Sequence, residues 1–156
     1  MEKLCIGFKI KMKKAGFVYK DHTADVSVRS WGRTLEEAFS QTALSLMTTI
    51  TPDLSKISQE IEKNIVVESE DKYALCFDFL SEFLYIFDVE ELVFSNVIVK
   101  TIEKTNNKFK LEAIVYGEKF NKNKHEIGTL VKGITYSFME ISEKKNRVEI
   151  DIVFDI

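Results

Sequence analysis

Apolar and polar residues along the first fifty positions predict two short strands followed by a helix. Gly16–Lys20 has the composition of a short strand, and Val26 and Val28 alternate with polar neighbours across Ala24–Trp31. Strict alternation of this kind is typical of a strand with one buried face. We therefore expect the chain to open with two strands.

A helical repeat follows these strands. Thr34, with Glu37 three residues later, has the spacing of a capping box at a helix start. Seven apolar residues then recur at helical spacing and predict the buried face: Leu35, Ala38, Phe39, Ala43, Leu46, Met47 and Ile50. Pro52 ends this helix.

The middle of the chain predicts a strand and a second helix. Ile61–Glu68 is rich in β-branched residues, and Asp71 is placed to cap a helix over Tyr73–Phe87. This second helix is apolar on nearly all sides, which predicts that it is sandwiched in the core.

The second half of the chain predicts strands. β-Branched and aromatic residues are enriched in four segments: Phe94–Glu103, Lys108–Tyr116, Gly133–Ser142 and Arg147–Ile156. Asn106 and Asn107 are turn residues between the first two. Early helices and late strands predict an α+β fold, with two helices packed on one face of a largely antiparallel or mixed β-sheet.

Composition narrows the class of protein. The 156 residues suit one domain, which we place at 16–156, with 1–15 as an extension that is either disordered or upstream of the true start. The net charge of −3 argues against RNA or DNA being held by this chain alone. We expect a cytoplasmic protein without a membrane segment, because no signal peptide or apolar run of bilayer length is present and Cys5 and Cys76 form no disulfide framework.

Two acidic segments are candidates for a metal site. Asp21 to Asp25 contains two carboxylates with His22 and Thr23 between them, and carboxylate oxygens suit hard cations. At the other end, an ordered strand would hold the Ile156 α-carboxylate beside Asp155, and adjacent anions need a cation or a basic side chain. Taken alone, the first segment is better interpreted as a turn and the second as a solvated strand end.

Other motifs exclude several chemistries. The segment that begins at His125 is not H-E-x-x-H, because Thr129 occupies the second His position. The sequence contains no P-loop, Rossmann glycine pattern, zinc finger or nucleophile elbow. Cys76 lies in an apolar helix and is interpreted as a core thiol. The residues therefore indicate an α+β domain with a candidate carboxylate metal site.

Five blocks of sequence together resemble the archease family. They are Tyr19-Lys20-Asp21-His22-Thr23-Ala24-Asp25-Val26, Trp31-Gly32-Arg33-Thr34-Leu35-Glu36-Glu37-Ala38-Phe39, Leu80-Ser81-Glu82-Phe83-Leu84-Tyr85, and Val131-Lys132-Gly133-Ile134-Thr135-Tyr136 with the terminal Phe154-Asp155-Ile156. The resemblance runs from about Gly16 to the last residue. Gly133 departs from the pattern, since the family commonly has Ala there.

The resemblance implies a function and a site. Archeases are protein cofactors, not enzymes, of the RtcB-type RNA ligase of tRNA splicing, and they promote its guanylylation and multiple turnover. The family binds a divalent cation, calcium in crystals, and the corresponding ligands here are Asp25, Asp155 and Ile156. Lys132 corresponds to a lysine important for ligase activation. Asp21, His22 and His125 are further candidate site residues, and RNA is expected to be contacted only through the ligase.

Two other functions stay open at this point. The carboxylates could serve a metal-dependent hydrolase, which also needs a nucleophile or general base in a substrate pocket. The chain could instead be a chaperone-like interaction domain without a metal role. Turnover without ligase would favour the hydrolase, and client binding that is insensitive to metal would favour the chaperone.

Overall fold

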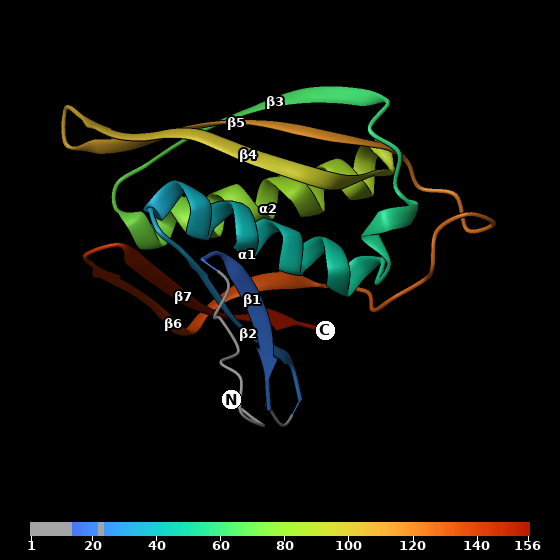
Figure 1. Cartoon of the computed structure of the whole chain (residues 1–156), viewed down its shortest axis with the longest axis horizontal. Coiled ribbons are helices and arrows are strands. Elements are labelled where there is room, and N and C mark those ends of the chain that lie inside the picture. The colour runs from blue at the N-terminus through green and yellow to red at the C-terminus, as the bar shows by residue number, and fades with distance from the viewer. Residues whose placement is uncertain (1–13, 22–23) are drawn as a thin grey trace, which may run out of the picture.

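The computed structural model describes residues 14–21 and 24–156, and the helices lie between two β-sheets (Figure 1). The expected extension over 1–15 therefore falls almost entirely outside the described residues. The strands are β1 (Gly16–Lys20), β2 (Val26–Gly32), β3 (Ile61–Ser69), β4 (Leu92–Thr105), β5 (Lys108–Lys119), β6 (Gly133–Lys144) and β7 (Arg147–Asp155). The helices are α1 (Leu35–Ile50), α2 (Lys72–Glu90) and a short 3₁₀ turn, η1 (Leu54–Lys56).

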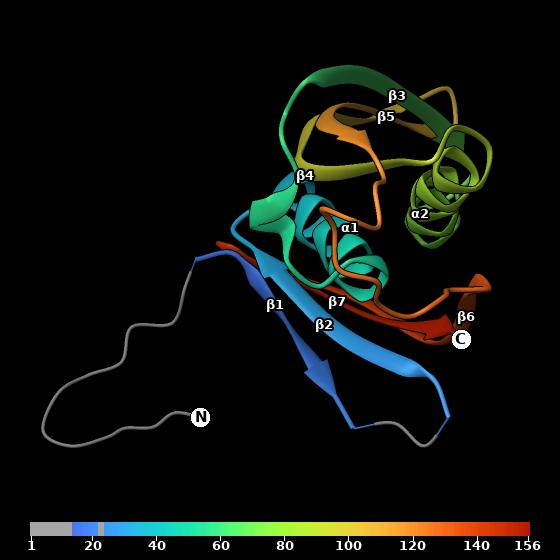
Figure 2. The same ribbon diagram turned by 90° about the vertical axis from the view of Figure 1, so that its right-hand side faces the viewer.

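The strands form two antiparallel sheets. One has four strands in the order β1-β2-β7-β6, and the other has three in the order β3-β5-β4. α1 packs against β2 of the first sheet and β4 of the second, while α2 packs against β6 and β3. Figure 2 shows the two helices side by side between the sheets, with α2 at the open edge of this layer.

The α+β class, the two helices and the antiparallel strands confirm the sequence prediction. The expectation of one sheet is corrected to two, because β2 pairs with β7 whereas β3 pairs with β5. Helices cover one face of each sheet, so every strand still has a single core-facing side. Strand partners are set by contacts between distant segments, which local alternation does not encode.

Local side-chain chemistry explains where the helices begin. The Thr34 hydroxyl accepts a hydrogen bond from the Glu37 amide at 3.1 Å, and the Asp71 carboxylate accepts one from the Ala74 amide at 2.8 Å. Both side chains satisfy amides that have no partner within the helix. Both predicted caps are therefore confirmed.

The core lies between the helices and the two sheets, but α2 is not enclosed on all sides. Its inward residues are fully or almost fully buried: Leu75, Cys76, Phe79, Leu80, Phe83 and Ile86. Its outer side exposes Tyr85 and Val89, at 60% and 59% of their surface. The prediction that α2 is sandwiched thus holds for its inner face only. Within the described ranges, no helix is long and apolar enough to cross a membrane.

Candidate functional site

Three segments from opposite ends of the chain meet at one corner of the four-stranded sheet. β2 and β7 pair in antiparallel register up to Val26 opposite Phe154, so Asp25 and Asp155 adjoin at the end of this ladder. On the other side of β7, Gly133 at the start of β6 pairs with Asp155. Strand pairing therefore brings together the two carboxylates that are 130 positions apart in the sequence.

The two carboxylates line one shallow cavity of about 280 Å³. The remaining lining residues come from β6 and β7: Gly133, Ile134, Thr135, Ser137, Phe138 and Val153. Thr135 and Ser137 were not predicted as site residues. The period-2 alternation along β6 from Gly133 could have found Thr135, because alternate residues of a strand share a face. Ser137 lies where the pairing of β6 with β7 is irregular, so alternation does not predict its place.

Most acidic groups on β7 are neutralised, but those at the corner are not. The Arg29 guanidinium donates two hydrogen bonds to Asp151, at 2.7 and 2.9 Å, and lies 4.0 Å from Glu149. These hydrogen bonds lower the pKa of Asp151. Among residues 14–21 and 24–156, neither Asp25 nor Asp155 has an ion-pair partner. The uncompensated negative charge therefore collects at the cavity.

The donors at this corner fit a hard divalent cation. Asp25 and Asp155 offer carboxylate oxygens, the ligand type that calcium prefers. The described residues hold no cluster of three or more His, Cys, Asp or Glu side chains. Two carboxylates alone do not complete the coordination of such an ion, and Ile156, which the resemblance gives as a further ligand, follows Asp155 directly in the sequence.

Lys132 lies next to this corner without lining the cavity. Its amide donates to the Asp155 carbonyl at 2.7 Å, and Lys132 is one of the residues that line a separate hollow beside α2. The adjoining Gly133 has room for a methyl group, since an added Cβ would meet nothing within 4 Å. The departure from the common Ala at this position thus leaves the local backbone undisturbed.

The further candidates do not all join the corner. Asp21 is exposed in the connection between β1 and β2 and does not line the cavity that Asp25 and Asp155 share. His22 lies outside the described residues. His125 belongs to a different part of the fold, described next.

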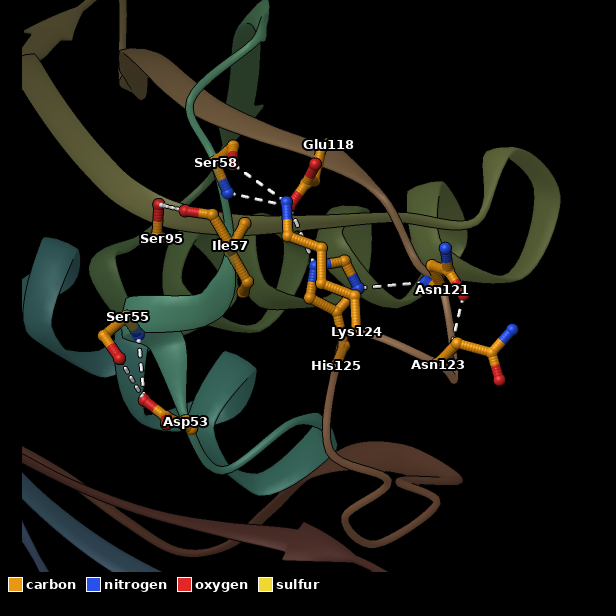
Figure 3. A network of polar contacts seen from close by, with 10 residues as sticks. All are labelled: Asp53, Ser55, Ile57, Ser58, Ser95, Glu118, Asn121, Asn123, Lys124 and His125. Atoms are coloured by element: carbon orange, nitrogen blue, oxygen red, sulfur yellow. Dashed lines mark hydrogen bonds and ion pairs between the residues drawn. The ribbon is translucent and has the colours of Figure 1, made fainter.

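His125 is held in a polar network between the end of β5 and the segment before β3 (Figure 3). Its side chain is fully buried, its Nδ1 accepts a hydrogen bond from the Asn121 amide at 2.9 Å, and its Nε2 lies 2.8 Å from Glu118 Oε2. The acceptor role of Nδ1 assigns the ring proton to Nε2, which donates to Glu118. Both ring nitrogens are therefore occupied within the protein.

Glu118 is the centre of that network. Burial raises the pKa of its carboxyl, but hydrogen bonds from Lys124, the Ser58 amide and His125 outweigh it and lower the pKa to about 2. The ionised carboxylate thus ties together three chain segments. His125 has a structural role here and is no ligand of the candidate cation site.

A comparison with known families decides the identity of the fold and its motifs. The model of a family described as "Archease protein family (MTH1598/TM1083)" matches residues 17–156, which is nearly the whole chain. The chain belongs to the archease family. This match spans all the blocks from which the resemblance was inferred, so the predicted family is confirmed.

Individual archeases agree with this assignment. "Protein archease" of Pyrococcus furiosus is 46% identical over 121 residues, which are 78% of this chain and 84% of that protein. "Protein archease-like" of Dictyostelium discoideum is 36% identical over 143 residues, 90% of this chain and 93% of that protein.

Solved structures share the fold. The solution structure of Methanobacterium thermoautotrophicum protein 1598 is 29% identical, has a TM-score of 0.76, and covers 90% of this archease and 99% of that chain. A Thermotoga maritima crystal structure, described as an archease and possible chaperone, has 19% identity and a TM-score of 0.55, covering 95% and 100%. The second likeness supports the fold alone.

Proposed function

We propose that this archease activates an RtcB-type RNA ligase of tRNA splicing by promoting ligase guanylylation and multiple turnover. The observation that carries the proposal is the family match over residues 17–156. The protein acts as a cofactor of the ligase and catalyses no reaction itself. RNA is contacted through the ligase, in keeping with the net charge of −3.

The cation site in this proposal consists of Asp25, Asp155 and the α-carboxylate of Ile156, with calcium as the first candidate ion. Three anionic groups at one corner repel each other unless a cation is bound. A bound ion would therefore hold the ends of β2 and β7 together with the start of β6. It serves either to deliver metal to the ligase or to keep this corner rigid for docking.

A guanylylation time course tests the function directly. Substoichiometric archease is added to its ligase with GTP and a divalent metal, and covalent guanylate and ligated RNA are followed. We expect more ligase turnovers with archease than without it. An unchanged time course with the cognate ligase contradicts the proposal.

Removing single carboxylates tests the site. Asp25→Ala and Asp155→Ala each take away one hard oxygen ligand, so cation affinity and ligase stimulation should fall together. The double variant should be scarcely worse than either single variant, because both changes damage one site. Calorimetric metal titration beside the guanylylation assay measures both effects, with Glu103→Gln, at an exposed position of β4, as control. Normal metal binding in the single variants refutes the ligand set.

The chain end offers a second test of the same site. One residue appended after Ile156 moves the terminal carboxylate by about 3.3 Å. We expect weaker cation binding and weaker stimulation, measured in the same two assays. Unchanged values in both would remove Ile156 from the ligand set.

A chaperone-like role is the second candidate, because the Thermotoga maritima neighbour is described as a possible chaperone. Suppression of client aggregation, measured by light scattering with and without EDTA, separates the two functions. Suppression that is insensitive to metal, together with no effect on the ligase, would favour the chaperone.

A further inference from the structure

The outer face of α2 is a surface on which large apolar side chains stay exposed. Tyr85 and Val89, one helical turn apart, are 60% and 59% exposed. Leu130, in the segment before β6, lines one hollow together with Tyr85 and is 73% exposed. Both sheets cover the helical layer from above and below, but α2 lies at its open edge (Figure 2). Clustered exposed apolar side chains of this kind mark interaction surfaces.

This surface is hollowed on both sides of Tyr85. One hollow, of about 420 Å³, lies between α2 and the segment before β6, and we call it the Lys132 hollow. Its wall is largely apolar, with Ile50, Leu84, Phe87 and Val131. A second hollow, of about 490 Å³, lies between α2 and β3 and shares Tyr85 with the first. Tyr85 lines both hollows, and we call the two together the groove.

The charge along the groove has one sign over most of its length. Asp78, Glu82 and Asp88 lie on the outer side of α2 and line the hollows. Asp78 accepts a hydrogen bond from the Ser69 hydroxyl at 2.7 Å, and none of the three has an ion-pair partner among the described residues. The nearby Lys63 is already paired with Glu90 at 3.2 Å. Lys132 stands at the far end, in the Lys132 hollow.

The groove is lined by both apolar and acidic side chains, so a complementary occupant has both apolar and basic side chains. We propose that the outer face of α2 docks a basic amphipathic segment of the ligase partner. A large apolar side chain of this segment enters the Lys132 hollow beside Tyr85. Its Lys or Arg side chains face Asp78 and Glu82, at the end of the groove away from Lys132, where they meet opposite charge.

This docking surface adjoins the candidate cation site. Lys132 is one of the residues that line the hollow, and its amide donates a hydrogen bond to the carbonyl of Asp155. A partner seated in the groove is thus one residue away from the carboxylate corner. The inference rests on the proposed function, and it assigns to Lys132 a place between the partner and the cation.

A matched pair of double variants tests the surface. Tyr85→Ala with Glu82→Lys removes the aromatic ring and reverses one charge in the groove. Ile98→Ala with Glu103→Lys makes the same kind of change on β4, at the sheet edge opposite β3. Ligase affinity is measured by calorimetry, and metal binding of each variant is titrated separately. Circular dichroism establishes that both variants are folded.

We expect the groove variant to bind the ligase about tenfold or more weakly, as for a central aromatic anchor. The β4 variant should bind like the wild type, and metal affinity should be unchanged in both. Higher salt should weaken wild-type binding more than binding of the groove variant. Wild-type affinity in the groove variant overturns the inference and leaves the proposed function intact.

A separate experiment tests the surface if the proposed ligase function is wrong. If the wild-type protein neither binds nor stimulates the ligase, a synthetic peptide with one Trp flanked by Arg residues serves as the probe. Amide shifts by NMR confined to α2 and residues 127–132, and lost in the groove variant, would sustain the surface. Shifts elsewhere, or none, would overturn it.

Discussion

At the scale of single residues, His125 shows how a residue with catalytic potential is used for structure. Its ring nitrogens join the Asn121 amide to Glu118, and Glu118 in turn holds Lys124 and the Ser58 amide. From the sequence, His125 was a further candidate for the site of Asp25 and Asp155. Burial of the side chain decides against it, and burial of one residue depends on segments far away in the sequence.

Replacing the imidazole should destabilise the fold. His125→Phe keeps most of the volume but leaves the Asn121 amide without its acceptor, and unsatisfied buried polar groups cost about 1–3 kcal/mol. Urea unfolding followed by circular dichroism measures the loss, with Glu126→Ala on the neighbouring exposed residue as control. A change in the free energy of unfolding as small as that of the control contradicts the structural role.

Glu118 should make stability depend on pH in acid. Its pKa in the folded protein is about 2, below the ordinary value of 4.5, so ionisation favours the folded state. This contribution is complete above the pKa of the unfolded chain and disappears as the pH falls from about 4.5 towards 2. The Glu118→Gln variant should lack that part of the pH dependence. Parallel slopes for both proteins in unfolding titrations across this range would show that the carboxylate is not stabilised.

At the scale of elements, the two ends of α2 differ in how well the terminal residue suits its backbone conformation. Its start has an aspartate cap, whereas its end places Glu91 in the left-handed region, at φ 58° and ψ 34°. A side chain with a Cβ is strained there, and glycine is the residue usually found at this position. The Glu91 amide and carbonyl are bonded to Phe87 and Phe120, so only the side chain is unfavourable.

Glu91→Gly should therefore stabilise the protein. Relief of the left-handed strain is worth about 1 kcal/mol, and both backbone hydrogen bonds are retained. Thermal unfolding gives the change, and Val89→Gly, within the helix, should act in the opposite direction. A lower melting temperature for Glu91→Gly would mean that its side chain contributes more than the strain costs.

The elements themselves were largely predictable, for local reasons. The caps at Thr34 and Asp71 and the turn at Asn106 and Asn107, both at positive φ, are encoded within a few residues. β6 was harder, because four of its residues, 136–139, bulge opposite β7 between the Thr135 and Glu140 pairs. The bulge places Phe138 at φ 62° and 77% exposed beside the candidate cavity, which alternation alone does not predict.

At the scale of the whole molecule, the two sheets depend on shared helices. α1 contacts both sheets, and Phe39 of α1 meets Phe79 of α2 with ring centres 6.1 Å apart. The adjacency of Asp25 and Asp155 also belongs to this scale, because it follows from the pairing of β2 with β7. Reasoning from the individual residues did not decide whether Asp25 and Asp155 form a metal site. The prediction that they belong to one site came from the family resemblance.

Loss of the central contact should weaken both sheets together. Phe39 is fully buried, and Phe39→Ala should cost about 3–5 kcal/mol. Trp31 fluorescence monitors the four-stranded sheet, and hydrogen exchange of β5 amides monitors the other. Both should shift to the same lower denaturant midpoint. Separate midpoints would show that the sheets unfold independently.

The pairing of β2 with β7 has a consequence for biosynthesis. β2 leaves the ribosome well before its neighbour β7, which follows all the other described strands in the chain, so the four-stranded sheet cannot close until β7 has been made. The three-stranded sheet uses neighbours that are closer in the chain and has no such delay. The corner that holds Asp25 and Asp155 is therefore assembled only after β7 has emerged, and a product truncated before β7 would lack the site altogether.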